Sequence, residues 1–264
     1  MGYFSRRRPR VFGHRGAAGI APENTLVSFE RAVADGAEFL ELDVHASRDD
    51  VVVVIHDPTL ERTTDGHGPV RALSYAELRR HDAGYRFESG GSHPFRGRGV
   101  RVPSLEEVLD AFPTIPLNIE IKQGDPPIEP LVARLLAEKG ASDRVLLAAE
   151  DDSIIKRIRL AAPDVVTSFS YEEAREFFQR CFAGDLGGYT PPGRALQVPP
   201  RFGDVELASR ATIDAAHARG LEMHLWTIND ELEMERLLEL GADGLMSDFP
   251  AVLRHVTDRF RARS

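Results

Sequence analysis

This sequence of 264 residues lacks the second cysteine that a disulfide bond needs and the long apolar run that a membrane-spanning helix needs. It contains a single cysteine, Cys181, which excludes an internal disulfide bond and a zinc site built from cysteines. No apolar run approaches the roughly 20 residues that a transmembrane helix needs, and no apolar signal-peptide core follows the basic N-terminal segment. We therefore expect a cytoplasmic protein with no stable membrane insertion.

Basic residues are also fewer than acidic ones. The sequence has 33 Lys and Arg against 42 Asp and Glu, which gives a formal net charge of −9. This sign disfavours a nucleic-acid partner, because such binding depends on neutralising phosphates with Lys and Arg. A small anionic substrate stays compatible with it, because a local cation or a bound metal can overrule the global charge. The composition leaves the oligomeric state open.

Several widespread catalytic motifs are absent. The sequence has no G-x-x-x-x-G-K-[ST] phosphate loop, no G-x-S-x-G nucleophile elbow and no G-x-G-x-x-G dinucleotide turn. It also lacks the His-x-His pair of zinc hydrolase barrels. Function therefore has to be inferred from the order of the predicted elements and from the polar residues that they carry.

Short apolar runs alternate with helical patterns along most of the chain, which is typical of a parallel sheet with crossover helices. Strands are predicted at residues 11–14, 39–45, 51–56, 117–122, 145–149, 165–169, 195–198, 222–228 and 244–247. Helices are predicted at residues 24–34, 74–81, 126–138, 153–162, 171–181, 209–218 and 230–240, several of which end at Gly or Pro stop signals.

Two of these strands are joined differently from the others. Only residues 46–50 separate the second strand from the third, which is too short for a parallel crossover of about a dozen residues. The two strands should form an antiparallel hairpin, which leaves eight parallel strands, the number that closes a TIM barrel. We expect a single TIM (β/α)8 barrel domain over residues 1–264, with an extra hairpin strand. A glycine-rich insertion at about 57–103 should lie near the site; the alternative fold is an open doubly wound sheet.

Polar residues gather at the predicted strand ends, where barrel enzymes place their active sites. The first strand ends on His14-Arg15, and the third ends on His56. Alternate strand residues share a face, so the second and fourth strands each direct a pair of charged side chains into the barrel: Glu41 with Asp43, and Glu120 with Lys122. Three converging carboxylates need a cation, and oxygen ligands suit Mg²⁺, Ca²⁺ or Mn²⁺ better than zinc.

Each of these signals has a structural explanation when it is taken alone. A His-Arg pair can simply end a strand, and an alternating acidic strand can be a solvated hairpin face. Their shared position at one end of the barrel is what favours a site. Six other histidines have no converging partners in the sequence and are expected to be surface, loop or helix residues: His45, His67, His81, His93, His217 and His255.

With these residues identified, the sequence resembles the glycerophosphodiester phosphodiesterase family over nearly its whole length. The matching segments are HRGAAGIAPENT at 14–25, ELDVHASRDDVVVVIHDPTLERTTDG at 41–66, LNIEIK at 117–122, HLWTIND at 224–230 and GADGLMSDFP at 241–250. The resemblance implies a TIM barrel and one divalent metal ion, Mg²⁺ or Ca²⁺. It implies the following roles: Glu41, Asp43 and Glu120 as metal ligands, His14 and His56 as acid and base, and Arg15, Lys122, Trp226 and Glu23 as substrate-binding residues.

The implied activity is metal-dependent hydrolysis of glycerophosphodiesters to sn-glycerol 3-phosphate and an alcohol. The neighbouring glycerol hydroxyl would attack phosphorus, and water would then open the cyclic phosphate; which histidine acts as the acid stays open. One alternative is lysophospholipase D activity on lysophospholipids in the same site. The insertion has Tyr85, Phe87 and Phe95 but no amphipathic membrane-surface helix, which favours a small soluble diester. A non-catalytic phosphate-binding barrel and a metal-dependent aldolase or isomerase are further alternatives.

Overall fold

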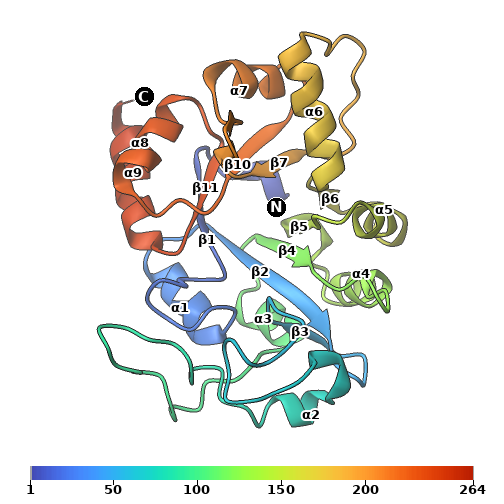
Figure 1. Cartoon of the computed structure of the whole chain (residues 1–264), viewed down its shortest axis with the longest axis vertical. Helices are drawn as coiled ribbons and strands as arrows, with labels where there is room; N and C mark the ends of the chain where they lie inside the picture. Colours follow the sequence, from blue (N-terminus) through green and yellow to red (C-terminus); the bar gives the residue numbers. More distant parts are fainter. Residues whose placement is uncertain (1, 264) are drawn as a thin grey trace.

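The computed structural model describes residues 2–263 and contains a nearly closed barrel of eight parallel strands. Its strands follow one another around the barrel in the order β6-β5-β4-β2-β1-β11-β10-β7 (Figure 1). A further bridge between Ser168 and Ala195 joins the two ends of this order. The barrel strands are β1 (Arg10–Gly13), β2 (Phe39–Ala46), β4 (Leu117–Ile121), β5 (Val145–Ala148), β6 (Val166–Thr167), β7 (Ala195–Val198), β10 (Glu222–Leu225) and β11 (Gly244–Ser247).

The short connection after β2 produces the predicted hairpin. β3 (Val52–Val54) pairs antiparallel with β2, with Val44 opposite Val54, and stands outside the circle of parallel strands. The prediction of a TIM barrel with an extra hairpin strand is therefore confirmed, and the open sheet is excluded.

Helices cover the outside of the barrel. The predicted ones are α1 (Leu26–Ala34), α2 (Tyr75–Leu78), α4 (Glu129–Glu138), α5 (Asp152–Ala161), α6 (Tyr171–Ala183), α7 (Arg210–His217) and α8 (Glu231–Glu239). Two helices were not predicted, namely α3 (Leu105–Ala111) and α9 (Pro250–Arg263). Single 3-10 turns lie at Tyr3–Ser5, Val70–Ala72 and Ser142–Arg144. Within residues 2–263, no helix has both the length and the apolar character needed to cross a bilayer.

Strand parity separates the barrel interior from its outer layer. On β2, Leu40 and Leu42 belong to the apolar core beneath the outer helices, whereas Glu41 and Asp43 face the interior. β4 repeats the pattern, with Ile119 in the outer core and Glu120 inside. Because neighbouring parallel strands run in register, Asp43 lies directly beside Glu120. The predicted convergence of the two strands is therefore confirmed.

The N-terminal segment closes the end of the barrel opposite to the site. Tyr3 is 2% exposed and its ring meets that of Phe39 edge-on, with centroids 5.2 Å apart. The buried guanidinium of Arg10 lies 5.4 Å from the centre of the Phe39 ring and pairs with Glu222 at 2.6 Å. An ion pair held against aromatic rings compensates the cost of burying Arg10 and seals this floor.

The insertion after β3 has its own small core. Residues such as Leu60, Val70 and Leu78 pack together there, apart from the two large cores around the barrel. Figure 1 places α2 and its neighbouring loops at one end of the molecule's long axis, and α6 and α7 at the other. The insertion and α6 therefore flank the barrel from opposite sides.

Candidate active site

Three carboxylates form the centre of the candidate site. Glu41, Asp43 and Glu120 each offer an oxygen, and these oxygens all lie within 4.8 Å of one another. Glu41 and Asp43 are only 4% and 1% exposed. Three acidic groups at this spacing repel one another strongly unless cations or hydrogen-bond donors compensate them.

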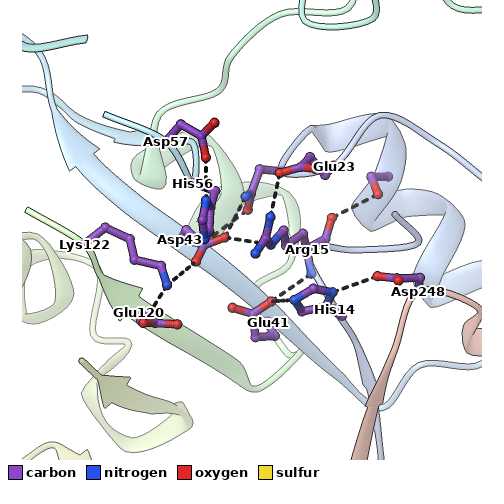
Figure 2. A network of polar contacts seen from close by, with 12 residues as sticks. His14, Arg15, Glu23, Glu41, Asp43, His56, Asp57, Glu120, Lys122 and Asp248 are labelled. Carbon is purple, nitrogen blue, oxygen red and sulfur yellow. Dashed lines mark hydrogen bonds and ion pairs between the residues drawn. The ribbon is translucent and has the colours of Figure 1, made fainter. Parts of the chain in front are cut away.

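Two basic side chains supply part of this compensation (Figure 2). Lys122 Nζ lies 2.7 Å from Glu120 Oε1 and 3.5 Å from Asp43 Oδ1. Arg15 Nε lies 3.2 Å from Asp43 Oδ2, and the amide of Asn24 donates to the same oxygen at 2.9 Å. Asp43 therefore has three compensating partners, and Lys122 also compensates Glu120.

The mutual repulsion of the carboxylates affects the pKa values of Glu41 and Glu120. Burial, and next the charge of Asp43, raise the pKa of Glu41 from 4.5 to about 7. Burial also raises the pKa of Glu120, although Lys122 opposes this shift. The raised pKa values of Glu41 and Glu120 mean that the neighbouring basic side chains do not supply enough positive charge to keep both carboxylates ionised. The donor set therefore fits a hard divalent cation such as Mg²⁺ or Ca²⁺.

The turn after β1 brings the His14-Arg15 pair to this cluster. Arg15 has a φ of 47° and Asn24 a φ of 57°, which are strained left-handed conformations for residues other than glycine. In this conformation the backbone N–H of Arg15 donates to Glu41 Oε2 at 2.8 Å, and Asn24 N–H donates to the Arg15 carbonyl at 3.0 Å. Backbone strain at this turn thus orients a donor toward a buried carboxylate.

His14 is held by an aspartate from the last barrel strand end. Its Nδ1 lies 2.7 Å from Asp248 Oδ1, and Asn229 donates to the other oxygen of Asp248 at 2.7 Å. An ionised carboxylate only accepts, so Nδ1 carries a proton and Nε2 is left to exchange one; Nε2 lies 3.9 Å from Glu41 Oε2. Burial alone would lower the pKa of His14, but Asp248 and Glu41 raise it.

His56 has an equivalent arrangement on the other side of the cluster. Its Nδ1 lies 2.6 Å from Asp57 Oδ1, and Arg62 donates to Asp57 at 2.6 Å. Although burial opposes the shift, Arg62 and His56 lower the pKa of Asp57 to about 2, so that Asp57 is ionised at neutral pH. Arg62 also binds Glu23 through two donors at 2.7 Å, and Glu23 accepts from Arg15 at 2.9 Å. Both histidines are thus fixed by a carboxylate on Nδ1.

A cavity of about 710 Å³ opens above these residues. The polar half is lined by the residues of β1, β2, β3 and β4 described above, and Trp226 at the end of β10 also lines the cavity. The opposite half is mainly apolar and is formed by α6 and by a small hairpin of β8 (Arg201–Phe202) and β9 (Val205–Glu206), although Arg175 and Gln179 of α6 also line it. We call this half the apolar wall; it consists of Tyr171, Phe178, Phe182, Phe202, Val205 and Leu207.

A model of the glycerophosphoryl diester phosphodiesterase family matches residues 14–252. The chain belongs to this family. It is 31% identical to the glycerophosphodiester phosphodiesterase of Bacillus altitudinis over 251 residues, which cover 91% of this chain and 95% of that protein. It is 29% identical to mouse lysophospholipase D GDPD1, over 96% of this chain and 87% of that protein. The structure of a glycerophosphodiester phosphodiesterase from Agrobacterium tumefaciens matches with a TM-score of 0.76 at 26% identity, over 93% of this chain and 99% of that one.

The structure of this phosphodiesterase-family chain brings most of the predicted site residues together. His14, Arg15, Glu41, Asp43, His56, Glu120, Lys122 and Trp226 all line the cavity. Glu23 is not among the lining residues, and it binds the two arginines instead. Most of the histidines expected to be without partners have one: His45 Nε2 lies 3.0 Å from the carbonyl of His56, and His217 Nε2 lies 2.7 Å from Asp243. His93 Nδ1 lies 3.0 Å from the carbonyl of Phe87, and His81 Nδ1 lies 3.5 Å from Asp65.

Sequence reasoning missed the groups that hold the histidines in place. Asp57 and Asp248 directly follow the third and last predicted strands but were given no role, and Asn24 was interpreted only as a helix start. An aspartate next to a catalytic histidine candidate, as in His56-Asp57, is a readable signal. The insertion reaches the site through Asp57 and Arg62, but within the described chain none of its residues lines the cavity. The absence of an amphipathic helix in the insertion therefore does not bear on the choice of substrate.

Proposed function

We propose that this protein hydrolyses glycerophosphodiesters to sn-glycerol 3-phosphate and an alcohol, with His14 and His56 as the acid–base pair. Membership of the glycerophosphoryl diester phosphodiesterase family supports the reaction class. The observation that carries the residue assignment is the pair of Nδ1–carboxylate contacts, at 2.7 Å for His14 and 2.6 Å for His56. Each contact fixes the ring and leaves Nε2 for proton exchange beside the carboxylate cluster.

Glu41, Asp43 and Glu120 are the residues that would hold a divalent metal ion, either Mg²⁺ or Ca²⁺. A metal bound there would neutralise charge on the phosphate oxygens and so make the phosphorus more electrophilic. The spacing of their oxygens and the raised pKa of Glu41 support this assignment.

Arg15 and Lys122 are the proposed phosphate ligands. Both line the cavity next to the carboxylates, and an arginine can donate two parallel hydrogen bonds to a phosphate. Burial alone would lower the pKa of Lys122, but Glu120 and Asp43 raise it, so Lys122 stays charged at neutral pH. Glu23 acts on the substrate through Arg15, whose guanidinium it holds at 2.9 Å. Trp226 lines the cavity at the proposed place of the glycerol.

Two proton transfers complete the reaction. In the first step one histidine takes the proton of the glycerol hydroxyl next to the phosphate ester, whose oxygen attacks phosphorus. The other histidine gives a proton to the leaving alcohol as its P–O bond breaks, which leaves a cyclic phosphate. Water then opens the ring, with the two histidines in reversed roles. Histidine suits both tasks because its ordinary pKa lies near neutrality.

The test is the release of glycerol 3-phosphate from glycerophosphocholine, first with EDTA and then with added Mg²⁺ or Ca²⁺. We expect no turnover with EDTA and recovery with one of the two ions. Turnover that persists in EDTA would contradict the metal assignment, and no turnover under any of these conditions would contradict the substrate. The cytoplasmic location stays a prediction from the sequence.

The apolar wall favours lysophospholipids as a second substrate class with the same phosphate chemistry. A glycerophosphodiester with a small polar alcohol leaves this half of the cavity without a matching group. Cleavage of lysophosphatidylcholine to lysophosphatidic acid and choline, measured beside that of glycerophosphocholine, distinguishes the two substrates.

A further inference from the structure

A line of hydrogen-bonded side chains crosses the barrel interior between the carboxylate cluster and the closed end. It runs from Asn118 on β4 through Gln197 on β7 to His224 on β10. His224 contacts Glu222, which pairs with Arg10 at the closed end of the barrel. Asn118, Gln197 and His224 have no part in the function proposed above. Polar side chains are costly to bury in a barrel interior, so the presence of three in one line calls for an explanation.

The hydrogen bonds along this line have fixed directions. Although burial opposes the shift, hydrogen bonds from Arg10 and His224 lower the pKa of Glu222 to about 2, so Glu222 is ionised and only accepts. His224 Nε2, which lies 3.0 Å from Glu222 Oε2, therefore carries a proton. An amide nitrogen only donates, so Gln197 Nε2 donates to His224 Nδ1 at 3.3 Å and to Asn118 Oδ1 at 2.7 Å. Each side chain thus sets the orientation of the next.

Close packing holds the histidine of this line in place. His224 is fully buried, and the centre of its ring lies 5.0 Å from that of Phe12. Gly244 stands opposite His224 on the neighbouring strand β11, where a Cβ atom would lie 2.7 Å from the Phe12 ring and 3.2 Å from the imidazole. Glycine therefore makes room for both rings, and the imidazole has little space in which to turn.

The line ends at an amide group in the wall of the active-site cavity. Asn118 is only 2% exposed, yet it lines the cavity beside Glu41, its partner in the register of β2 and β4. Its side chain lies on the same strand face as that of Glu120. Gln197 occupies the amide oxygen, whereas Nδ2 of Asn118 donates to no residue among positions 2–263. A buried amide with unpartnered N–H groups is a ready donor for a ligand in the polar half of the cavity.

We propose that Asn118 is a substrate ligand, whose Nδ2 donates a hydrogen bond to an oxygen of the glycerophosphate, and that Gln197 is the residue that positions it. The proposal rests on the phosphodiester chemistry proposed above, in which the neighbouring carboxylates Glu41 and Glu120 hold the metal that binds the phosphate. The direction of the amide decides its effect. Its N–H groups attract an anionic oxygen, whereas a reversed Asn118 would present its own oxygen and repel the substrate.

The first experiment reverses the amide without emptying its site. Gln197→Glu keeps the side-chain shape but replaces the donating nitrogen by an oxygen, so that Asn118 can bond to residue 197 only through its own Nδ2. We expect kcat/KM for glycerophosphocholine to fall by about tenfold to a hundredfold, as for the loss of a hydrogen bond to a charged group. Gln179→Glu is the matched control, because Gln179 of α6 lines the same cavity and the change adds the same charge; it should lower kcat/KM by less than about threefold.

A double-variant cycle then separates positioning from a structural defect. Asn118→Ala removes the donor and should lower kcat/KM by about as much as Gln197→Glu. If Gln197 acts through Asn118, the Asn118→Ala/Gln197→Glu double variant should lose little more than Asn118→Ala alone. Losses that multiply in the double variant would overturn the positioning role of Gln197. Unchanged kcat/KM in Asn118→Ala would overturn the ligand role of Asn118.

A third experiment measures binding without turnover. Calorimetry with sn-glycerol 3-phosphate, in the presence of Mg²⁺ or Ca²⁺, should give a Kd that rises at least tenfold in Asn118→Ala and in Gln197→Glu but not in Gln179→Glu. Equal Kd values in the wild type and in Asn118→Ala would contradict the proposal. If this dependence of Kd on Asn118 is seen but the wild type hydrolyses no diester, the proposed function fails and the ligand role of Asn118 stands.

Discussion

The polar and apolar halves of the cavity are built in different ways. In the polar half, Glu41, Asp43 and Glu120 stand on the adjacent strands β2 and β4, and each contacts a donor or a basic group within 3.2 Å. In the apolar half, Phe182 and Phe202 stand on a helix and a two-residue strand, with about half of their surface exposed. Proton transfer and phosphate binding depend on precise directions, whereas apolar contact is non-directional. In the proposed function, the rigid sheet therefore carries the chemistry, and the helix and the hairpin outside it influence which other groups of a ligand are bound.

Removing a histidine from the polar half should have the largest effect. His14→Ala and His56→Ala should each lower kcat for glycerophosphocholine by about 10²–10⁴-fold, because a positioned acid or base contributes that much. The measurement is steady-state turnover with saturating metal. His255→Ala, an exposed histidine of α9, is the matched control and should be unaffected. Turnover near the wild-type value in either cavity variant would refute the acid–base assignment.

Metal binding to the polar half of the cavity should stabilise the folded wild-type protein. At a metal concentration a hundredfold above Kd, Mg²⁺ or Ca²⁺ should raise the free energy of unfolding by about 2.7 kcal/mol relative to EDTA. Thermal unfolding measures this shift. Glu41→Gln, which keeps the side-chain volume and removes a ligand charge, should abolish most of it. An undiminished shift in this variant would place the metal elsewhere.

The same stabilisation should depend on pH with a definite sign. The pKa of Glu41 is raised from 4.5 in the unfolded chain to about 7 in the metal-free protein. Between these values the folded state keeps a proton that the unfolded state has lost, so metal-free stability falls as pH rises. Above pH 7 Glu41 is ionised in both states, and the proposed metal ion would bind it without competition from a proton. The metal-induced shift should therefore be larger at pH 8 than at pH 5.5.

The aspartates behind the histidines should have intermediate effects on turnover. Asp248→Asn and Asp57→Asn should lower kcat by about tenfold to a hundredfold, because an amide no longer fixes the ring and its proton on Nδ1. KM should change much less, because neither aspartate lines the cavity. A raised KM with unchanged kcat would contradict the positioning role. The pH profile of kcat should also shift, which a purely structural defect would not produce.

Changes in the exposed apolar half should have the smallest effect on stability. Phe182→Ser should alter the free energy of unfolding by no more than about 0.5 kcal/mol, since the side chain is 55% exposed. Phe177→Ala on the same helix is the comparison, because Phe177 is fully buried and its loss should cost about 3–5 kcal/mol. Urea unfolding measures both variants. Similar losses would mean that Phe182 belongs to the structural core and not to a binding surface.

The polar half could be predicted from the sequence because its signals are local. A five-residue connection gave the hairpin, and strand parity placed Glu41 with Asp43 and Glu120 with Lys122. The partners of the histidines depend on distant segments, as with His14 and Asp248, which are 234 positions apart. Such contacts follow only from barrel closure, where the first and last strands pair.

The apolar half could not be predicted because its pattern resembles an ordinary core. A helix was expected at residues 171–181, and α6 extends to Ala183; its aromatic residues include the buried Phe177 as well as the exposed Phe182. The β8–β9 hairpin has two-residue strands around Gly203, with φ of 56°, and such strands are too short to show alternation. By contrast, α3 carries a readable capping box at Ser104 and Glu107 that was overlooked.

The floor built from Tyr3, Phe39 and the Arg10–Glu222 pair has a kinetic consequence. Because the barrel is closed at that end, its cavity has a single opening, at the carboxyl ends of the strands. Molecules that enter there have to leave by the same opening. In the proposed reaction the alcohol has to depart before water can reach the cyclic phosphate, which fixes the order of release. The phosphomonoester leaves last and competes with fresh substrate for the vacant enzyme, whereas the alcohol, which leaves first, does not.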